Sequence, residues 1–362
     1  MTIWRKIRME VTMSIKEWYG FIGFGQMGGN VIKSIQAKDY LVMAANTAQS
    51  DLDSLNIPEE CKYHILGGYG SSKERRKAKQ LLADNNCENF DLLINEIKER
   101  FKECRVIFLV GSSGGGSGSA IVPATKRRLQ AETDKIICVV TCIPDKNASI
   151  KEYMNCYEFF QELETVEGNG ATIIIDNNRN KDKLILNEQL TCYLDAFLNC
   201  ETNSARGVVD RAEIENVLSQ RGACIINKHG SDKATTQTVI EKIRDNIYAP
   251  LEDDEVVANI ALVNSNDNVR LNEIVDNVGK PFATFEGWDY DATVLAISGC
   301  SIPYKRLEEM KKKIEEDKET IKKNLTATSE RRLTGSIDFL GDITVEKPKP
   351  EKKKSTRDLL FL

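Results

Sequence analysis

The sequence predicts an α/β protein built on a doubly wound, mostly parallel sheet, with a long central helix, a smaller α+β second domain, a C-terminal helix and a flexible tail. Two observations support the sheet: short apolar runs typical of buried parallel strands recur in the first half of the chain, and helical patterns separate them. The third is composition, because 362 residues with 41% hydrophobic side chains can bury the cores of two domains.

The parallel strands are expected at five apolar runs, which are residues 19–23, 41–45, 106–110, 136–141 and 172–175. The intervening helices are expected at residues 73–84, 90–102 and 121–131. Ligands of such sheets bind at the carboxyl ends of the strands. The loops that follow the strands are therefore where a site is expected.

The second half begins with a long apolar helical pattern at residues 183–203, which predicts a buried connecting helix. Strand-like runs follow at residues 223–227, 256–264, 282–285 and 293–298. Residues 305–323 predict a charged surface helix, and the Lys- and Pro-rich remainder cannot bury enough apolar surface to fold. These patterns divide the chain into an arm (1–17), a first domain (18–182), the central helix (183–206), a second domain (207–303), the C-terminal helix (304–323) and a disordered tail (324–362). The arm is expected to be a short amphipathic segment or a flexible leader.

Charge and cysteine usage exclude several classes of function. The formal net charge of -5 gives no general attraction to DNA phosphates, so no direct sequence-specific DNA binding is expected. The ten cysteines include no C-x-x-C pair and the two histidines lie far apart, so no protein-bound metal is expected. No run has the length of a signal peptide or a membrane span, which predicts a cytoplasmic protein without membrane contact.

The first expected strand runs into the glycine-rich loop Gly23-Phe-Gly25-Gln-Met-Gly28-Gly29-Asn30. Backbone N–H groups of such a loop can approach a phosphate at a helix N-terminus. The loop also matches the dinucleotide fingerprint G-x-G-x-x-G, which favours an NAD(P)-dependent oxidoreductase as an alternative. That fingerprint expects an acidic residue after the second strand, where this chain has Asn46, so the dinucleotide hypothesis is weakened.

A second glycine-rich loop, Gly111-Ser-Ser-Gly-Gly-Gly-Ser-Gly-Ser-Ala120, follows the apolar run VIFLV and precedes a helical pattern. Its N–H groups and hydroxyls could wrap a phosphate chain. A flexible linker is the alternative, but a linker is unexpected inside a strand-to-helix turn. No lysine follows the loop, so this is not the loop of a P-loop NTPase.

In this loop the chain resembles the tubulin/FtsZ superfamily of GTPases, since GGGSGSA is similar to its signature G-G-G-T-G-[ST]-G. The order of the loops also agrees, over roughly residues 18–325. The stretch Gly67-Gly-Tyr-Gly-Ser-Ser72 is similar to the γ-phosphate loop of that family, and Asp176-Asn-Asn-Arg179 to the loop beside the guanine. Within the family, the first loop, the acidic loop and the charged helix after Pro303 look most like the TubZ type.

The resemblance implies that residues 18–182 are a GTP-binding domain, that residues 207–303 are an activation domain, and that the cofactors are GTP or GDP with Mg²⁺. It implies base contacts from Asn30, Asn177 and Asn187. The full set of implied nucleotide contacts is Gly25, Gln26, Met27, Gly28, Asn30, Asn46, Gly68, Gly70, Ser71, Ser72, Ser113, Gly114, Gly115, Gly116, Ser117, Gly118, Ser119, Pro144, Asn177 and Asn187.

After the central helix, the stretch Gly207-Val-Val-Asp-Arg-Ala-Glu213 resembles the catalytic loop N-x-D-x-x-[DE] of the family, with Val208 in place of asparagine. The resemblance makes Asp210 and Glu213 catalytic acids. The same D-x-x-E pattern before an apolar run is also a capping box, which would make the two residues purely structural.

The resemblance implies a polymer that completes its hydrolytic site only when the acidic loop of one subunit meets the nucleotide of the next. The expected partners are a second copy of the chain, head to tail, and a DNA-binding adaptor at a centromere-like site, for the segregation of plasmid or prophage DNA. Three alternatives stay open: an FtsZ-like division GTPase, a polymer that binds nucleotide without turnover, and the oxidoreductase. The basic run and apolar end of the tail suggest a recruitment element, with a merely solubilising tail as the alternative.

Overall fold

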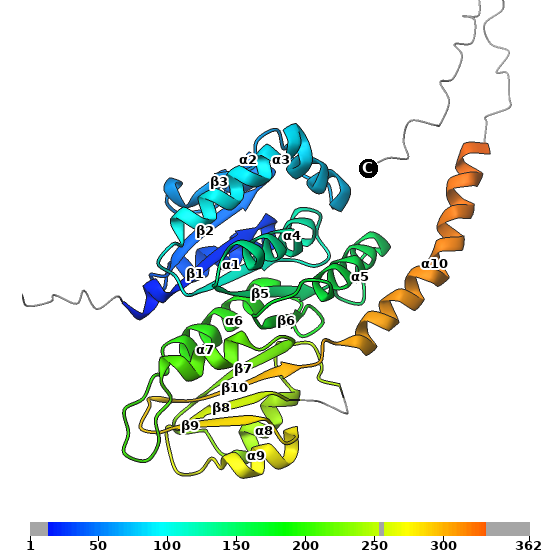
Figure 1. Ribbon diagram of the computed structural model, residues 1–362. Coiled ribbons are helices and arrows are strands. Elements are labelled where there is room, and N and C mark those ends of the chain that lie inside the picture. Colours follow the sequence, from blue (N-terminus) through cyan, green and yellow to red (C-terminus); the bar gives the residue numbers. More distant parts are fainter. Residues whose placement is uncertain (1–13, 253–256, 331–362) are drawn as a thin grey trace, which may run out of the picture. The chain divides into compact units, whose positions relative to one another are not determined.

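Ten strands form one sheet in the computed structural model, which describes residues 14–252 and 257–330 (Figure 1). The order across the sheet is β3-β2-β1-β4-β5-β6-β7-β10-β8-β9. The strands are β1 (Tyr19–Phe24), β2 (Leu41–Asn46), β3 (Lys62–His64), β4 (Val106–Gly111), β5 (Ile136–Ile143), β6 (Thr172–Asp176), β7 (Ala223–Gly230), β8 (Asn259–Val263), β9 (Ala283–Gly287) and β10 (Ala292–Cys300).

The sheet has a parallel part and a mixed part. Strands β3, β2, β1, β4, β5 and β6 are all parallel; the apolar runs predict five of them, and β3 was not predicted. The mixed part contains β10, which is antiparallel to both β7 and β8, and β9, which is parallel to β8. Within the sheet, the two parts are joined by β6 and β7, whose parallel pairing is limited to Thr172 and Ala223.

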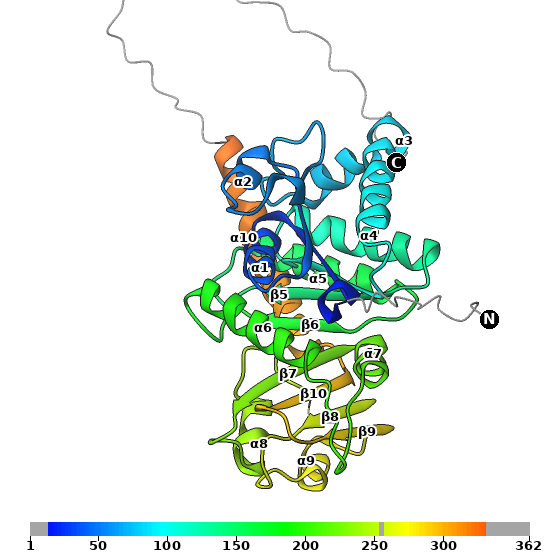
Figure 2. The same cartoon turned by 90° about the vertical axis from the view of Figure 1, so that its left-hand side faces the viewer.

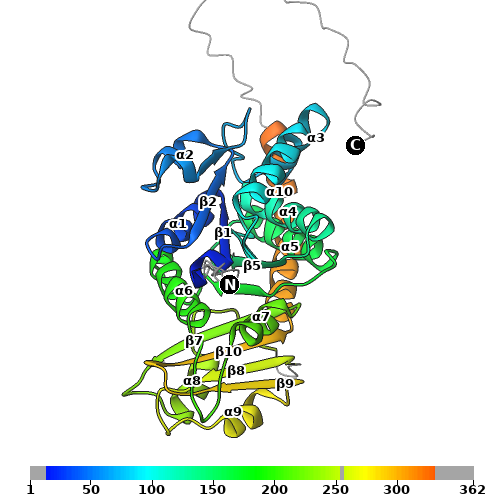
Figure 3. The same ribbon diagram turned by 60° about the vertical axis from the view of Figure 1, so that its left-hand side comes forward.

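Helices cover both faces of the sheet, which is the doubly wound arrangement (Figure 3). Alternation along the strands produces two cores: Val106, Phe108 and Val110 of β4 belong to one, and Ile107 and Leu109 to the other. The first core also takes side chains from α1 (Gly25–Gln36), α2 (Gln49–Asp53), α6 (Lys183–Leu198) and α7 (Arg211–Ser219). The second takes side chains from α3 (Arg75–Arg100), α4 (Ser117–Glu132), α5 (Ile150–Glu164), α8 (Thr236–Arg244), α9 (Leu271–Val278) and α10 (Tyr304–Glu330).

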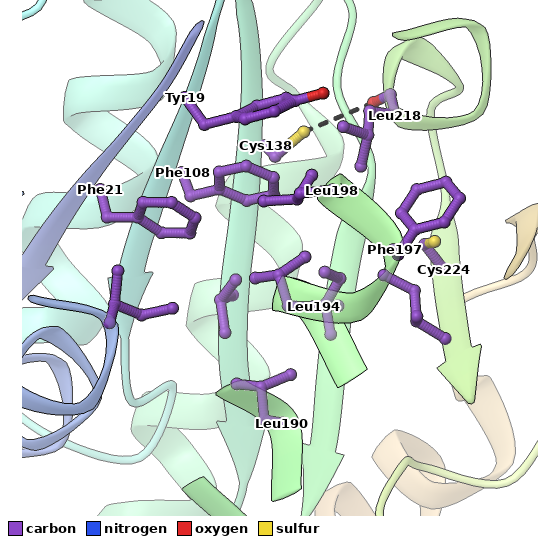
Figure 4. Close-up of a cluster of buried hydrophobic side chains, with 14 of the residues drawn as sticks. Tyr19, Phe21, Phe108, Cys138, Leu190, Leu194, Phe197, Leu198, Leu218 and Cys224 are labelled. Atoms are coloured by element: carbon purple, nitrogen blue, oxygen red, sulfur yellow. Dashed lines mark hydrogen bonds between the residues drawn. The ribbon is translucent and has the colours of Figure 1, made fainter. Parts of the chain in front are cut away.

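The helix α6 is the predicted central helix, and its apolar side chains are buried against the sheet (Figure 4). Leu190, Leu194 and Phe197 lie on the same face of the sheet as Phe21 and Phe108. The rings of Phe21 and Phe108 stack with centroids 4.6 Å apart. Burying each such side chain contributes roughly 1.5–3 kcal/mol, so this helix is fixed firmly to the parallel strands.

Two predicted helix ends are wrong. The central helix ends at Leu198 and not near residue 203, because the Asn199 side chain donates to the Asp195 carbonyl oxygen at 2.7 Å and to the Tyr40 hydroxyl at 2.7 Å. The C-terminal helix continues to Glu330, beyond its expected end at residue 323. The seven added residues contain neither glycine nor proline, so nothing in them stops a helix.

The remaining short elements are two 3-10 turns, η1 (Ile15–Trp18) and η2 (Glu59–Cys61). The predicted helices at 73–84 and 90–102 correspond to α3, which is kinked at residues 84–87. The chain divides into two units, Met1–Asp317 and Lys318–Leu362, and the sites below lie in the first. Residues 1–13 of the expected arm and 331–362 of the expected tail lie outside the described residues. None of the described helices is both long and apolar enough to span a membrane.

Candidate functional site

The predicted loops gather at the carboxyl edge of the parallel strands. The register pairs Phe24, the last residue of β1, with both Ala45 of β2 and Gly111 of β4. At the other side of β4, Ile143 of β5 pairs with Asp176 of β6. The loops that follow β1, β2, β4, β5 and β6 therefore start next to one another, and helices α1, α2, α4 and α6 begin just beyond them.

The first glycine-rich loop is the first turn of α1. Gly25 has a φ of +71°, and a Cβ on it would lie 3.5 Å from the Gly118 nitrogen, so this turn touches the second glycine-rich loop. Gly28 lies so close to β4 that a Cβ would be 2.6 Å from the Val110 oxygen. Gln26, Met27, Gly28 and Asn30 all lie in this part of α1. The N–H groups of a first helical turn lack partners within the helix and attract anions.

The second glycine-rich loop joins β4 to α4, with Gly116 at the N-cap of the helix. Its serine hydroxyls all bond to the protein itself, and two of them donate to backbone carbonyl oxygens. The Ser113 hydroxyl donates to the Cys142 carbonyl oxygen at 2.6 Å, and the Ser119 hydroxyl donates to the carbonyl oxygens of Gly115 and, at 3.2 Å, Gly116. These bonds shape the loop, and they leave its backbone N–H groups as the donors for a phosphate.

A row of three hydroxyls joins three loops. The Ser117 hydroxyl lies 3.0 Å from the Thr47 hydroxyl and donates to the Ser71 hydroxyl at 3.1 Å. Thr47 follows β2, Ser117 begins α4 and Ser71 lies in the predicted γ-phosphate loop. All three residues are buried, so the row fixes these loops relative to one another.

The predicted γ-phosphate loop, residues 67–72, is folded against the loop after β2. A Cβ on Gly68 would lie 2.4 Å from the Thr47 oxygen, and the Gly70 N–H donates to that oxygen at 3.1 Å. Gly70 has a φ of +89° and Ser72 one of +49°, so the turn uses left-handed backbone. The Tyr69 side chain, between Gly68 and Gly70, is 99% exposed.

The remaining predicted contacts line the loops after β2, β5 and β6. Pro144 packs on Gly114, where a Cβ would lie 2.9 Å from the proline Cγ. Asn187 is 7% exposed in the second turn of α6, and Asn177 directly follows β6. The Asn46 side chain is engaged locally, because it donates to Asp51 at 3.0 Å and accepts from the Ala48 N–H at 3.1 Å.

Asp145, next to Pro144, pairs with Lys183 at the start of α6, with 2.9 Å between carboxylate and ammonium. Burial opposes the charged form of Asp145, but hydrogen bonds from Lys183 and the Asn147 N–H outweigh it and lower the pKa of this carboxyl. A carboxylate therefore stays ionised next to Pro144, one of the expected nucleotide contacts.

The two predicted catalytic acids lie at the opposite end of the parallel strands. Arg211, the residue after Asp210, stacks over Trp18, which precedes β1, with 4.8 Å to the ring centroid. Glu215 of α7 pairs with Arg105, which precedes β4, at 3.6 Å. Figure 2 shows α7 at the end of the sheet where β1 begins. The six residues of β1 span about 20 Å, so one chain does not bring its acids to its own glycine-rich loops.

Asp210 and Glu213 also form the capping box that the sequence allows. The Asp210 carboxylate accepts from the Glu213 N–H at 3.0 Å, and the Asp210 N–H donates to the Glu213 carboxylate at 3.1 Å. Burial, and then the negative charge of Asp210, raise the pKa of Glu213. A raised pKa suits a group that exchanges protons with water.

Among residues 14–252 and 257–330, no group of three or more His, Cys, Asp or Glu side chains could hold a metal ion. A divalent cation at the glycine-rich loops would therefore be held mainly by phosphate oxygens, which is the usual way that proteins hold Mg²⁺ with a nucleotide.

Sequence reasoning missed three residues that the structure places in this site. Thr47 supplies the first hydroxyl of the row, and Asn155 of α5 bonds to the second glycine-rich loop. Arg75, at the start of α3, is 4% exposed and donates to the Ser119 carbonyl oxygen at 3.1 Å. Asn155 and Arg75 lie in helical sequence without a recognisable motif, and only the packing of α3 and α5 against α4 brings them here.

Comparisons with known proteins show which chains this one is similar to. Residues 20–184 match the family model described as the GTPase domain of the Tubulin/FtsZ family. The chain is 28% identical over 324 residues to the tubulin-like protein TubZ of a Clostridium botulinum C phage, covering 88% of each chain. It is also similar to a solved structure of Clostridium botulinum phage c-st TubZ with a truncated C-terminal tail, with a TM-score of 0.74 and 25% identity over 84% of this chain and 99% of that one. A GTPγS-form protofilament of Bacillus thuringiensis serovar israelensis TubZ has the same fold, with a TM-score of 0.68 and 18% identity over 84% of this chain and 94% of that one.

Proposed function

We propose that the chain is a GTPase of the tubulin/FtsZ family that assembles head to tail into dynamic filaments, because residues 20–184 match the GTPase domain of that family and the chain is similar to a phage TubZ. The observation that carries this proposal is the separation of two groups of residues. The glycine-rich loops follow the carboxyl ends of β1 and β4, whereas Asp210 and Glu213 lie beside the residues that precede these strands. A complete hydrolytic site then needs two copies, and repeating such a contact gives an open filament.

In this proposal, the triphosphate binds to the N–H groups of residues 114–118 and the first turn of α1. Residues 68–72 surround the γ-phosphate, with Gly68, Gly70, Ser71 and Ser72 in contact. Asn30, Asn177 and Asn187 contact the guanine, and Pro144 and Asn46 complete the set of nucleotide contacts. Mg²⁺ would neutralise charge on the phosphate oxygens that hold it.

Hydrolysis would use the neighbouring subunit. Asp210 and Glu213 of that subunit orient a water molecule and accept its proton as it attacks the γ-phosphate. The raised pKa of Glu213 makes it a better proton acceptor than an ordinary surface carboxylate. Backbone N–H groups of the glycine-rich loops stabilise the charge that develops on the phosphate.

A second candidate is a filament protein that binds nucleotide but does not turn it over. The capping box favours it, because both acids already have a structural task at the start of α7. A dinucleotide-dependent oxidoreductase has less support, because the Asn46 side chain is bonded to Asp51 and Ala48 where a ribose-binding carboxylate would be needed.

The cellular task that we propose is segregation of plasmid or prophage DNA, with an FtsZ-like division role as the alternative. The similarity to a phage TubZ supports segregation. The net charge of -5 argues against direct wrapping of DNA, so a DNA-binding adaptor would connect the filament to its replicon in the cytoplasm.

The decisive experiment measures phosphate release from GTP as a function of protein concentration, alongside sedimentation of polymer. A site that forms between subunits gives specific activity that rises steeply with concentration in parallel with polymer. A non-hydrolysing filament gives GTP-dependent polymer with no phosphate release above background. Specific activity that is constant down to concentrations without polymer would refute the shared site.

A further inference from the structure

One buried amide holds the backbone of the second glycine-rich loop. Asn155 lies in the second turn of α5 and is 6% exposed. Its side-chain nitrogen donates to the carbonyl oxygens of Gly114 and Gly115, each at 3.1 Å, and to that of Lys73 at 2.9 Å. An amide nitrogen has two hydrogens, so the three oxygens share them. A single side chain thus joins the loop after β4 to the segment that follows the γ-phosphate loop.

These bonds determine which way the loop N–H groups point. In a trans peptide, the carbonyl oxygen and the N–H of the next residue point in opposite directions. Because the oxygens of Gly114 and Gly115 turn toward Asn155, the N–H groups of Gly115 and Gly116 turn away from it. The Ser119 hydroxyl donates to the Gly116 carbonyl oxygen at 3.2 Å. The Ser117 N–H, on the same peptide, therefore points away from Ser119. Three consecutive N–H groups of this kind make an anion-binding nest.

The segment after the γ-phosphate loop is fixed at the same place. Ser72 and Lys73 have φ values of +49° and +58°, which side-chain-bearing residues adopt only when their surroundings hold them. Arg75 anchors the next turn, because its guanidinium donates to the Ser119 and Asn155 carbonyl oxygens at 3.1 and 3.4 Å. It also pairs with Glu158 and Glu162 of α5, at 3.2 and 2.9 Å.

We propose that Asn155 is a positioning residue that turns the N–H groups of residues 115–116 toward the phosphates and holds the γ-phosphate loop in register with them. It does not touch the nucleotide itself. The inference rests on the proposed GTP site, and it adds a residue that sets how strongly the protein distinguishes nucleotides by their number of phosphates. Removing the amide should weaken triphosphate binding most and monophosphate binding least.

The sharpest variant is Asn155→Asp, which keeps the shape but replaces the donor with a carboxylate oxygen facing three carbonyl oxygens. Repulsion between the carboxylate and these oxygens should turn the loop carbonyls away from residue 155. The loop N–H groups would then no longer point at the phosphates. Competition binding would compare GTP, GDP and GMP. The ratio of GTP to GMP affinity should fall about tenfold or more, which is the size expected for lost hydrogen bonds to a charged group. In Asn155→Ala, which only removes the donor, the ratio of GTP to GMP affinity should fall less.

Asn259→Asp is the matched control. Asn259 of β8 is 1% exposed, and its amide donates to the Asn216 carbonyl oxygen at 3.3 Å and to the Asn216 side-chain oxygen at 2.9 Å. It should lose thermal stability and keep the parent ratio of affinities, since β8 carries none of the loops. Thermal unfolding of all variants would be measured beside binding.

The outcomes separate this inference from the proposed function. If the parent protein does not bind GTP, the proposed function fails before any variant is needed. If the parent binds GTP and folded Asn155→Asp keeps its affinity ratio, or loses affinity for the three nucleotides equally, Asn155 has no role in orienting the phosphate donors. Should Asn155→Asp not fold, the ratio of GTP to GMP affinity would be measured on Asn155→Ala instead. A ratio equal to that of the parent protein would overturn the inference.

Discussion

Asp210 caps α7, and in the proposed mechanism it also polarises water. The two tasks are separable, since capping a helix needs an oxygen acceptor and polarising water needs a negative charge. Asparagine caps a helix about as well as aspartate, whereas alanine costs about 1 kcal/mol. We therefore expect Asp210→Asn to unfold like the parent and Asp210→Ala to be less stable. Both should lose GTP hydrolysis by roughly 100-fold or more while still forming filaments. Thermal unfolding and phosphate release from sedimented polymer would check this, and normal hydrolysis in Asp210→Asn polymer would leave the residue as a helix cap alone.

Gly116 has no room for a side chain. A Cβ there would lie 2.2 Å from the Ser71 hydroxyl oxygen and 2.8 Å from the Glu74 nitrogen, so even Gly116→Ala must displace the γ-phosphate loop. Overpacking of this kind costs about 1–3 kcal/mol, and we expect GTP affinity to fall by roughly 5- to 150-fold in titrations. The control is Gly230→Ala at the exposed end of β7, where the nearest atom is an Asp232 carboxylate oxygen at 3.1 Å. If folded Gly116→Ala binds GTP as tightly as the parent protein, Gly116 is not part of the phosphate site.

At the level of single elements, β7 carries a pH-sensitive residue. Burial, and then the nearby Lys242 ammonium, lower the pKa of His229 to about 4. Between about pH 6.5 and pH 4 the unfolded chain binds more protons at this residue than the folded chain, so stability falls as the pH falls through that window. His229→Gln removes this titration. Thermal unfolding measured from pH 7 to pH 4 should therefore decline less steeply in the variant, and curves of equal slope would show that His229 does not contribute.

Elements differ in how far the sequence predicts them. The parallel strands were predictable because both faces of β1 and β4 are buried, which leaves a continuous apolar run in the sequence. The end of α6 was not, because Asn199 ends it through a contact with Tyr40, a residue 159 positions away. For the site, the glycine-rich loops have local patterns that reveal them. Asn155 and Arg75 have none, because their roles arise only where three helices meet.

At the level of the whole molecule, a site shared between subunits means that an inactive subunit prevents hydrolysis by its neighbour. At fixed total protein concentration, replacing part of the parent protein with Asp210→Asn should lower phosphate release per parent subunit in proportion to the share of the variant. The reason is that a parent nucleotide covered by a variant acidic loop cannot be hydrolysed. Sedimentation would verify that both proteins enter the polymer. Constant release per parent subunit at every mixing ratio would place the entire site within one chain.

The tail can be tested separately from the polymer. Since α10 reaches Glu330, a chain shortened after this residue keeps every described helix. It should polymerise and hydrolyse GTP but fail to co-sediment with adaptor and centromere DNA. A full-length chain with serine at positions 359–362 would show whether the apolar end or the basic run is needed. If the shortened chain carries the adaptor and DNA as well as the parent does, the binding surface lies on the folded body.

The row of hydroxyls formed by Thr47, Ser117 and Ser71 also has a direction. The Ser117 hydroxyl has one hydrogen and gives it to Ser71, so it accepts a hydrogen from Thr47 and the row runs from Thr47 toward Ser71. In the proposed GTP site, the last hydrogen, on Ser71, is then free to point at a γ-phosphate. Hydrogen bonds in a chain polarise one another, so a phosphate that accepted this hydrogen would strengthen the other two bonds as well. The γ-phosphate would thereby be coupled to the loop after β2 without any movement of a heavy atom.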